Sequence, residues 1–198
     1  MRTADKAQVA CEAIVIGASS GGVEALSTLL AALRQGIGAS VFVVLHLPRA
    51  RRSDLASLFA SHCVLPVREA VDKEPIVAGT VYVAPPDYHL LIDSGPAISL
   101  SVDAPVNHSR PSIDVLFESA ADIYAERLLG IVLTGASEDG AAGLEAIHRA
   151  GGRTLVQLPA SAVSPQMPAA ALARVPASPA LPLVELAKAL HGLRPRIS

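Results

Sequence analysis

Three side chains with the chemistry of acyl transfer follow three separate apolar runs of the sequence. Ser19 lies in a glycine-rich turn, His46 comes directly after one apolar run, and Asp139 follows another by a few residues. A serine hydroxyl is a weak nucleophile until an imidazole takes its proton, and a carboxylate that orients the imidazole improves this base. The three residue types therefore predict hydrolysis of an ester or amide through an acyl-enzyme.

The turn around Ser19 reads GASSGG over residues 17–22 and contains the G-x-S-x-G pattern. Small neighbours allow a sharp strand-to-helix turn that lifts a serine hydroxyl above the sheet. Backbone N–H groups at the start of the following helix can then stabilise an oxyanion. Ser19 and Ser20 compete for the role of nucleophile in this turn.

Each part of the set also has a structural interpretation. Glycine-rich turns after a first strand commonly bind phosphate, but this turn lacks the G-x-G-x-x-G spacing and the P-loop lysine. His46 and Asp139 could be ordinary turn residues, and His89 is the strongest rival for the base. The chain order Ser, His, Asp excludes a plain α/β-hydrolase, in which the acid precedes the histidine.

The elements that must position these residues alternate between short apolar strands and amphipathic helices. We expect strands near 13–16, 40–45, 79–84, 89–93, 129–133 and 153–157, and helices near 23–33, 54–61, 112–120, 140–150 and 183–190. This order predicts a doubly wound three-layer α/β/α fold with a mostly parallel sheet. The segments 79–84 and 89–93 are expected to form an antiparallel hairpin. Because parallel strands end at one edge, the three candidate residues should meet there.

The composition of the chain limits the classes of partner, cofactor and cellular location to be expected. The 198-residue chain has 16 basic and 18 acidic residues, and only Arg49, Arg51 and Arg52 form a basic cluster, so nucleic acid is not an expected partner. Cys11 and Cys63 form no C-x-x-C pair, so we expect neither a zinc site nor a disulfide framework. We also expect no other metal and no cofactor. No secretory signal and no apolar run of membrane-spanning length is evident, which favours the cytoplasm.

Four separated motifs resemble the catalytic domain of the CheB-type chemotaxis methylesterases over about residues 12–190. They are IGASSGG at 16–22, LHLP at 45–48, RPSID at 110–114, and LTG at 133–135 through DG at 139–140. The resemblance implies a doubly wound sheet with an antiparallel hairpin. It also implies removal of methyl groups from glutamyl methyl esters of chemoreceptors, with release of methanol, and deamidation of receptor glutamine in some members.

The resemblance also assigns roles within the site. The family nucleophile falls on Ser19 rather than Ser20, the base on His46, and the orienting carboxylate on Asp139 rather than Glu138. We further assign oxyanion or substrate binding to Ser20, Gly21 and Ala136. The implied substrate is the cytoplasmic domain of a methylated chemoreceptor.

Two features depart from the family pattern. The family loop usually reads T-G-M-G-x-D-G, whereas Ala136 and Ser137 occupy the methionine and second glycine positions. We therefore expect an altered pocket rim, and backbone strain if position 137 needs a positive φ.

We also divide the chain into a tail at 1–11, a catalytic domain at 12–190 and a tail at 191–198. With about a dozen residues before the first strand, the domain is expected to stand alone without a phospho-receiver domain, either constitutively open or controlled by another protein.

Two rival hypotheses stay open at this point. The glycine turn and Arg49, Arg51 and Arg52 could dock a receptor helix or an anionic ligand without catalysis. Alternatively, Ala136 could widen the pocket of a general esterase that acts on small molecules. Serine-dependent turnover separates the first from an enzyme, and a comparison of small esters with methylated receptor separates the second.

Overall fold

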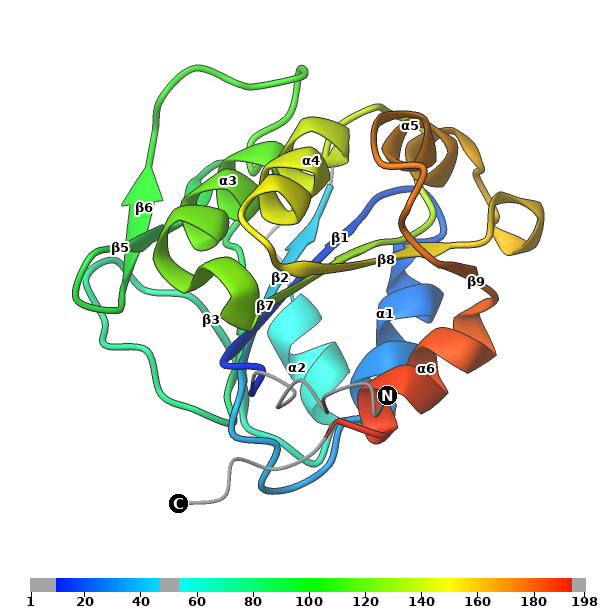
Figure 1. Cartoon of the computed structure of the whole chain (residues 1–198). Coiled ribbons are helices and arrows are strands. Elements are labelled where there is room, and N and C mark those ends of the chain that lie inside the picture. The colour runs from blue at the N-terminus through cyan, green and yellow to red at the C-terminus, as the bar shows by residue number, and fades with distance from the viewer. Residues whose placement is uncertain (1–9, 47–53, 194–198) are drawn as a thin grey trace, which may run out of the picture.

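The apolar runs form the strands of one seven-stranded sheet in the computed structural model, which describes residues 10–46 and 54–193 (Figure 1). The strands follow the order β3-β4-β2-β1-β7-β8-β9, and every paired neighbour is parallel. Their bounds are β1 (Ala13–Ala18), β2 (Ser40–Leu45), β3 (Val67–Glu69), β4 (Val81–Val83), β7 (Leu128–Val132), β8 (Arg153–Gln157) and β9 (Ala180–Leu181).

Helices cover both faces of the sheet (Figure 1). One face packs against α1 (Gly22–Ala31), α2 (Leu55–Ala60) and α6 (Leu183–His191). The other packs against α3 (Ile113–Tyr124), α4 (Ala141–Arg149) and α5 (Gln166–Arg174). Short 3-10 helices span Ala125–Arg127 and Pro159–Ser161. This arrangement confirms the predicted doubly wound three-layer α/β/α fold.

The central strand β1 explains why its sequence is continuously apolar. Ile14 and Ile16 point into the core beneath α1, α2 and α6, whereas Ala13 and Val15 point into the core beneath α3, α4 and α5. All four side chains are fully buried. A strand buried on both faces needs apolar residues at every position, as expected in a parallel sheet covered by helices.

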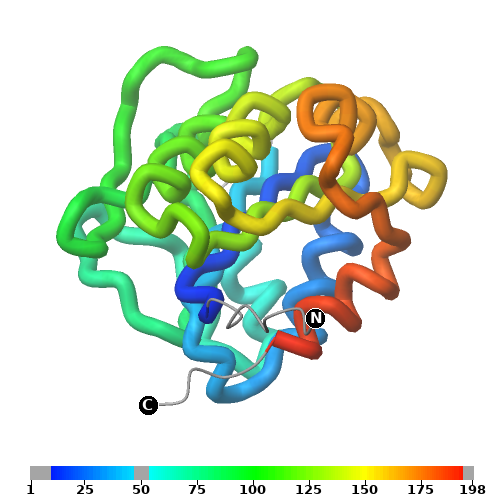
Figure 2. Tube along the Cα trace, viewed as in Figure 1, coloured from blue at the N-terminus to red at the C-terminus, as the bar shows by residue number. Residues whose placement is uncertain are grey.

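The predicted antiparallel hairpin exists, but the pairing expected for it is wrong. The segment around β4 joins the main sheet beside β2, while β5 (His89–Asp93) pairs with β6 (Ala97–Ser101) in a separate two-stranded sheet. Pro85 and Pro86 cannot donate ladder hydrogen bonds, so β4 ends before them. Gly95, with a φ of 90°, provides the turn between β5 and β6. The Cα trace shows this pair at the margin of the molecule (Figure 2).

Four elements of the structure were not predicted from the sequence. The strands β3 and β9 are short edge strands, β6 alternates weakly, and α5 lies in a segment rich in alanine, serine and proline. Pro168 fits α5 because it occupies the third helical position, where the backbone N–H has no intrahelical partner. In addition, α1 ends at Ala31, whereas the sequence pattern placed its end near residue 33.

Several expectations fall at the limits of the described residues. Most of the predicted tails 1–11 and 191–198 lies outside them, as do Pro48 and the cluster of Arg49, Arg51 and Arg52. Within the described part, no helix is long and apolar enough to cross a membrane. No group of three or more histidine, cysteine or acidic side chains there could hold a metal ion. Cys11 and Cys63 are both free thiols.

Candidate active site

The carboxyl ends of β1, β2 and β7 bring the candidate residues to one edge of the sheet. Ala18 and Leu45 are register partners across β1 and β2, so Ser19 and His46 follow paired residues. The His46 N–H donates to the Ala18 carbonyl at 3.1 Å. The Ser19 N–H donates to the carbonyl of Thr134, beyond the end of β7, at 2.9 Å. Ser19 is thus flanked by the ends of both neighbouring strands.

The end of β1 and the turn that follows it depend on two glycines. Gly21 has a φ of 77°, a left-handed conformation that glycine adopts without a steric cost, and α1 begins at the next residue. Gly17 lies so close to α3 that an added Cβ would approach Ile113 Cγ2 to 2.4 Å. Ser19 is half-buried at this turn, whereas Ser20 is exposed.

Residues after β7 support the serine turn from the other side. Thr134 Oγ1 donates to the Ser20 carbonyl at 2.8 Å and accepts the Ser164 N–H at 2.9 Å. A Cβ at Gly135 would lie 3.0 Å from Ser19 Cβ and 2.6 Å from the Cε atom of Met167. Ser19 and the buried thioether of Met167 therefore both occupy the space that a side chain at Gly135 would need.

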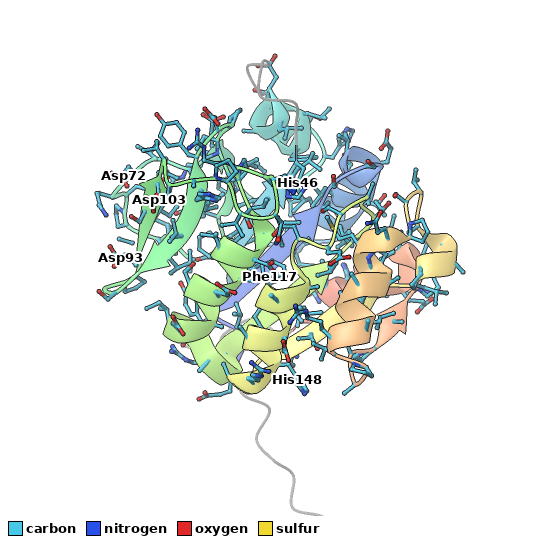
Figure 3. All side chains as sticks on the ribbon, turned by 90° about the horizontal axis from the view of Figure 1, so that it is seen from above. His46, Asp72, Asp93, Asp103, Phe117 and His148 are labelled. Atoms are coloured by element: carbon cyan, nitrogen blue, oxygen red, sulfur yellow. The ribbon has the colours of Figure 1, made fainter. Side chains whose placement is uncertain are left out.

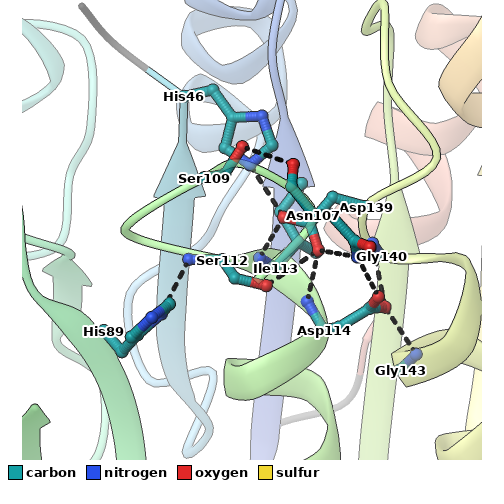
Figure 4. A network of polar contacts seen from close by, with 10 residues as sticks. All are labelled: His46, His89, Asn107, Ser109, Ser112, Ile113, Asp114, Asp139, Gly140 and Gly143. Carbon is teal, nitrogen blue, oxygen red and sulfur yellow. Dashed lines mark hydrogen bonds and ion pairs between the residues drawn. The ribbon is translucent and has the colours of Figure 1, made fainter. Parts of the chain in front are cut away.

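His46 and Asp139 form a hydrogen-bonded pair at this edge (Figure 4). The imidazole Nε2 lies 2.8 Å from Asp139 Oδ2; the His46 side chain is 13% exposed and that of Asp139 is fully buried. An ionised carboxylate only accepts hydrogen bonds, so Nε2 carries the proton. The lone pair of the neutral ring is then on Nδ1, the nitrogen that a nucleophile would use.

Asp139 is held by five donors. Oδ2 accepts the His46 ring and the Ile113 N–H, at 2.8 and 2.7 Å. Oδ1 accepts Ser112 Oγ at 2.8 Å, the Asp114 N–H at 3.1 Å and Asn107 Nδ2 at 3.1 Å. Burial of the carboxyl opposes its ionisation, but bonds from His46, Ile113, Asn107 and Ser112 outweigh burial and lower its pKa. The site therefore contains an ionised carboxylate at the N-terminus of α3.

Asp114 lies in the first turn of α3. Its Oδ1 accepts the N–H groups of Gly140 and Gly143, at 2.9 and 2.7 Å, and so caps α4. Ser112 is the residue before α3, but its hydroxyl donates to Asp139 and caps no backbone group. Burial, reinforced by the Asp139 charge, raises the pKa of Asp114.

His89, the rival base, supports the backbone instead. Its ring is 2% exposed, Nδ1 accepts the Ser112 N–H at 3.2 Å, and Nε2 lies 3.1 Å from the Ala104 carbonyl. Both ring nitrogens are occupied by backbone groups, so His89 has no nitrogen available for a substrate. It lies below the His46–Asp139 pair in Figure 4 and fixes the start of α3.

The residues assigned to oxyanion or substrate binding lie in the segments that follow β1 and β7. Gly21 is the N-cap residue of α1, and the first N–H groups of this helix have no intrahelical acceptors. Ser20 and Ala136 are exposed at the surface. Ser137 is not among the described residues with a positive φ, so the strain expected at this position is absent. Its Oγ atom is nevertheless buried and unpaired among the described residues.

Asn107 was missed by sequence reasoning. It lies in a loop between β6 and α3 and contacts both Asp114 and Asp139. The adjacent Asn107 and His108, with φ values of 48° and 62°, form a left-handed turn. Asparagine in a polar loop signals such a turn, but the sequence carries no sign of carboxylates 7 and 32 residues away.

A cavity of about 390 Å³ lies away from these residues. Leu129, His148, Arg153 and Thr154 are among its lining residues, and they lie toward the amino ends of β7 and β8 or the end of α4. In the view from above, His46 and His148 lie at opposite ends of the α3 and α4 layer (Figure 3). The cavity is therefore distinct from the candidate active site.

The fold and the site together define a class: doubly wound α/β proteins with the residue set of a serine hydrolase at the ends of their parallel strands. More specifically, the chain belongs to the CheB methylesterase family, whose model matches residues 14–190.

Individual relatives agree with this assignment. A protein of Leptospira interrogans is 44% identical over 161 residues, which cover 81% of this chain and 83% of that protein. The protein-glutamate methylesterase/protein-glutamine glutaminase 1 of Geobacter metallireducens is 40% identical over 182 residues, which cover 90% of this chain and 50% of that protein. The crystal structure of the Thermotoga maritima CheB methylesterase catalytic domain matches with a TM-score of 0.88 at 30% identity. It covers 94% of this chain and 100% of that domain.

Proposed function

We propose that this chain is a protein-glutamate methylesterase that hydrolyses glutamyl methyl esters of chemoreceptors to glutamate and methanol. Membership of the CheB methylesterase family supports the reaction. The observation that carries the site assignment is the 2.8 Å pair of His46 and Asp139 at the strand end next to that of Ser19. Such a pair supplies a base with a fixed tautomer beside a serine.

The reaction begins when His46 Nδ1 removes the proton of the Ser19 hydroxyl. The serine oxygen attacks the ester carbonyl, and Asp139 stabilises the imidazolium that forms. N–H groups around Gly21 and Ala136 bind the oxyanion, where loss of one donor typically costs about 10²- to 10³-fold in rate. His46 then protonates the methoxide leaving group, and water activated by the same ring hydrolyses the acyl-enzyme. No metal or other cofactor takes part in these proposed reaction steps.

The same steps extend to receptor glutamine, with ammonia instead of methanol as the leaving group. The Geobacter relative carries both activities in its name, which supports this second reaction. The substrate partner is the cytoplasmic domain of a methylated chemoreceptor, and a regulator in trans is a further proposed partner. We accordingly propose a cytoplasmic location. Residues 12–190 are the proposed catalytic domain.

The experiment measures methanol release from methylated receptor by the wild-type protein, Ser19→Ala and Ser20→Ala. Ser19→Ala should lose at least about 10³-fold in kcat because no nucleophile remains. Ser20→Ala should keep activity within about tenfold, because a neighbouring hydroxyl assists binding only. Full activity of Ser19→Ala would remove the assignment of the nucleophile.

The rival functions give different results in the same assay. A general esterase would hydrolyse small esters with a higher kcat/KM than methylated receptor. A non-catalytic module would bind receptor without any serine-dependent turnover. Either result would replace the proposed substrate or the proposed activity.

A further inference from the structure

One amide nitrogen joins two buried carboxylates behind His46. Asn107 Nδ2 donates to Asp114 Oδ2 at 2.7 Å and to Asp139 Oδ1 at 3.1 Å (Figure 4). Asp139 is fully buried and Asp114 is 5% exposed. Two negative charges that are both buried repel each other strongly, and a hydrogen-bond donor between them offsets this repulsion.

The orientation of the amide follows from its neighbours. Both contacts of the Asn107 side chain are to carboxylate oxygens, which accept hydrogen bonds when ionised. The amide oxygen could bond neither of them, so the NH₂ group faces the pair. Its two hydrogens match two acceptors, and the bridge uses its full donor capacity.

The loop that carries Asn107 is built to hold this group in place. The backbones of Val106 and Ser109 bond each other in both directions, at 3.1 and 2.9 Å, and close a tight left-handed turn over Asn107 and His108. On one side of the turn, Arg110 bonds Asp87 twice, at 3.0 and 2.8 Å. The same guanidinium donates to the carbonyls of Val102 and Asp103 at the start of the loop, so both ends of the loop are tied together.

The two carboxylates also link two helices reciprocally. Asp139, which precedes α4, accepts backbone N–H groups at the start of α3, and Asp114 in α3 accepts backbone N–H groups at the start of α4. The Asn107 bridge adds a direct connection between these two caps. Bonds from its amide lower the pKa of both carboxyl groups, while burial and then the charge of Asp139 raise the pKa of Asp114.

We propose that Asn107 is a positioning residue of the esterase site, whose amide holds the Asp139 carboxylate toward His46 by bridging it to Asp114. This inference rests on the proposed function. It goes beyond a structural role for the loop, because the amide acts on the carboxylate that orients the base. Asn107 itself touches neither Ser19 nor the substrate in this mechanism.

Two substitutions separate the amide from the turn. Asn107→Gly removes the amide but keeps a residue that favours the left-handed backbone. Asn107→Asp keeps the size of the side chain but replaces the donors with acceptors. A bond to a charged group is lost in both, so kcat for methanol release should fall about 10- to 100-fold. KM should stay within about twofold, because substrate binding is not altered.

The matched control is His108→Gly in the same turn. His108 is exposed, has a φ of 62° and makes no side-chain hydrogen bond among the described residues. Its replacement should leave kcat and KM at the wild-type values. A fall in kcat for His108→Gly as large as that for Asn107→Gly would mean that any change in the loop impairs the enzyme, and the inference would fail.

A reversed pair tests whether the amide acts through Asp139 or only anchors the loop. Asn107→Asp combined with Asp114→Asn restores a donor–acceptor contact between positions 107 and 114 but leaves Asp139 without the amide. Its melting temperature should recover relative to Asn107→Asp, whereas kcat should stay low. Recovery of kcat together with the melting temperature would overturn the inference, because the loop anchor alone would then suffice.

Failure of this inference and failure of the function are distinguishable. Wild-type turnover that is lost in Ser19→Ala supports the function, and wild-type kcat in Asn107→Gly would then overturn the positioning role alone. Wild-type protein without turnover on methylated receptor and without labelling by a serine-directed phosphonate would overturn the function, and the role of Asn107 with it.

Discussion

Asp139 combines two tasks in one carboxylate. It orients His46, and it also accepts two backbone N–H groups at the start of α3, where the helix dipole favours a negative charge. The helix therefore fixes the carboxylate independently of the histidine. This arrangement keeps the proposed base oriented before any substrate binds, which is the requirement of a preorganised site.

Asp139→Asn should impair both tasks. With its NH₂ group in place of Oδ2, the amide faces the His46 ring and favours the wrong tautomer, and the Ile113 N–H loses its acceptor. We expect kcat for methanol release to fall by about 10³- to 10⁴-fold, as expected when a triad loses its orienting carboxylate. A variant within about tenfold of the wild-type kcat would contradict the assignment.

The stability of the same variant should depend on pH. The pKa of Asp139 is lowered in the folded protein, so its contribution to stability is fully present above the unfolded value of about 3.9. That contribution is lost as the pH falls through the folded pKa. The difference in free energy of unfolding between the wild-type protein and Asp139→Asn should therefore shrink below about pH 4. Urea unfolding measured at several pH values checks this, and a difference independent of pH would contradict it.

Sequence reasoning placed three candidate residues at one sheet edge, and their catalytic roles stay a prediction. Ser19, His46 and Asp139 each follow an apolar run, and parallel strands bring such positions to one edge. It failed for Asn107 and for Asp114, because an amide or carboxylate in the sequence does not reveal its partner. Asp114 fits the first turn of its own helix equally well, and only the packing of α3 against α4 directs it to Gly140 and Gly143.

At the scale of elements, the contact between β1 and α3 determines where the α3 cap forms. Gly17 lies against Ile113, the first residue of α3, whose N–H donates to Asp139. Gly17→Ala places a Cβ about 2.4 Å from Ile113 Cγ2, a separation that real side chains do not tolerate. The helix or the strand must then shift.

Gly17→Ala should lower the free energy of unfolding by about 1–3 kcal/mol, the usual cost of overpacking a core, and should also lower kcat. Ile113→Ala in the same chain removes the clashing atoms, so the double variant should be more stable than the sum of the two single effects predicts. Thermal unfolding of the four proteins measures this coupling. Strictly additive effects would show that the two residues do not interact.

The end of α3 offers a second test. Tyr124 is buried, and desolvation of its hydroxyl, with the charge of Glu12, raises its pKa to about 12 against a lowering effect of Arg127. An acid with a raised folded pKa contributes stability that is fully present below the unfolded value of about 10 and is lost as the pH rises toward the folded pKa. The wild-type protein should therefore lose stability between about pH 10 and 12.

Tyr124→Phe should lack this alkaline loss, because phenylalanine has no proton to lose. Tyr88→Phe is the matched control, since Tyr88 is 42% exposed. The melting temperature of the three proteins across the alkaline range measures the effect. An alkaline loss in Tyr124→Phe equal to that of the wild-type protein would contradict the assignment.

Elements were predictable where the local pattern and the fold demand the same residues. The strands β1 and β2 are buried on both faces and so are marked by continuous apolar runs. The residues of β5 do not reveal its partner strand. The turn at Gly95 reverses the chain and brings β6 beside β5, and the pattern within β5 does not show this. Short edge strands such as β9 have too few residues for a pattern to emerge.

At the scale of the whole molecule, two apolar cores share one sheet. One core lies beneath α3, α4 and α5 and the other beneath α1, α2 and α6, and alternate residues of β1 belong to each. The serine turn and the His46–Asp139 pair lie at the edge where both layers meet the strand ends. The geometry of the site therefore depends on both cores, even though Asp139 caps only α3.

A substitution that removes buried atoms from either core should destabilise the entire molecule, and the molecule should still unfold in one transition. Ile14→Ala removes a fully buried side chain from one core, and Val15→Ala removes its neighbour from the other. We expect losses of about 2–5 kcal/mol in the free energy of unfolding for Ile14→Ala, and less for Val15→Ala because fewer atoms are removed.

Tyr82 and Tyr124 lie in the core with Val15, so their fluorescence reports on unfolding of that side of the sheet. Urea transitions by tyrosine fluorescence and by far-ultraviolet circular dichroism should coincide in both variants, since the shared sheet couples the cores. A fluorescence transition that stays at the wild-type midpoint in Ile14→Ala, while the circular dichroism transition moves, would show instead that the two faces unfold separately.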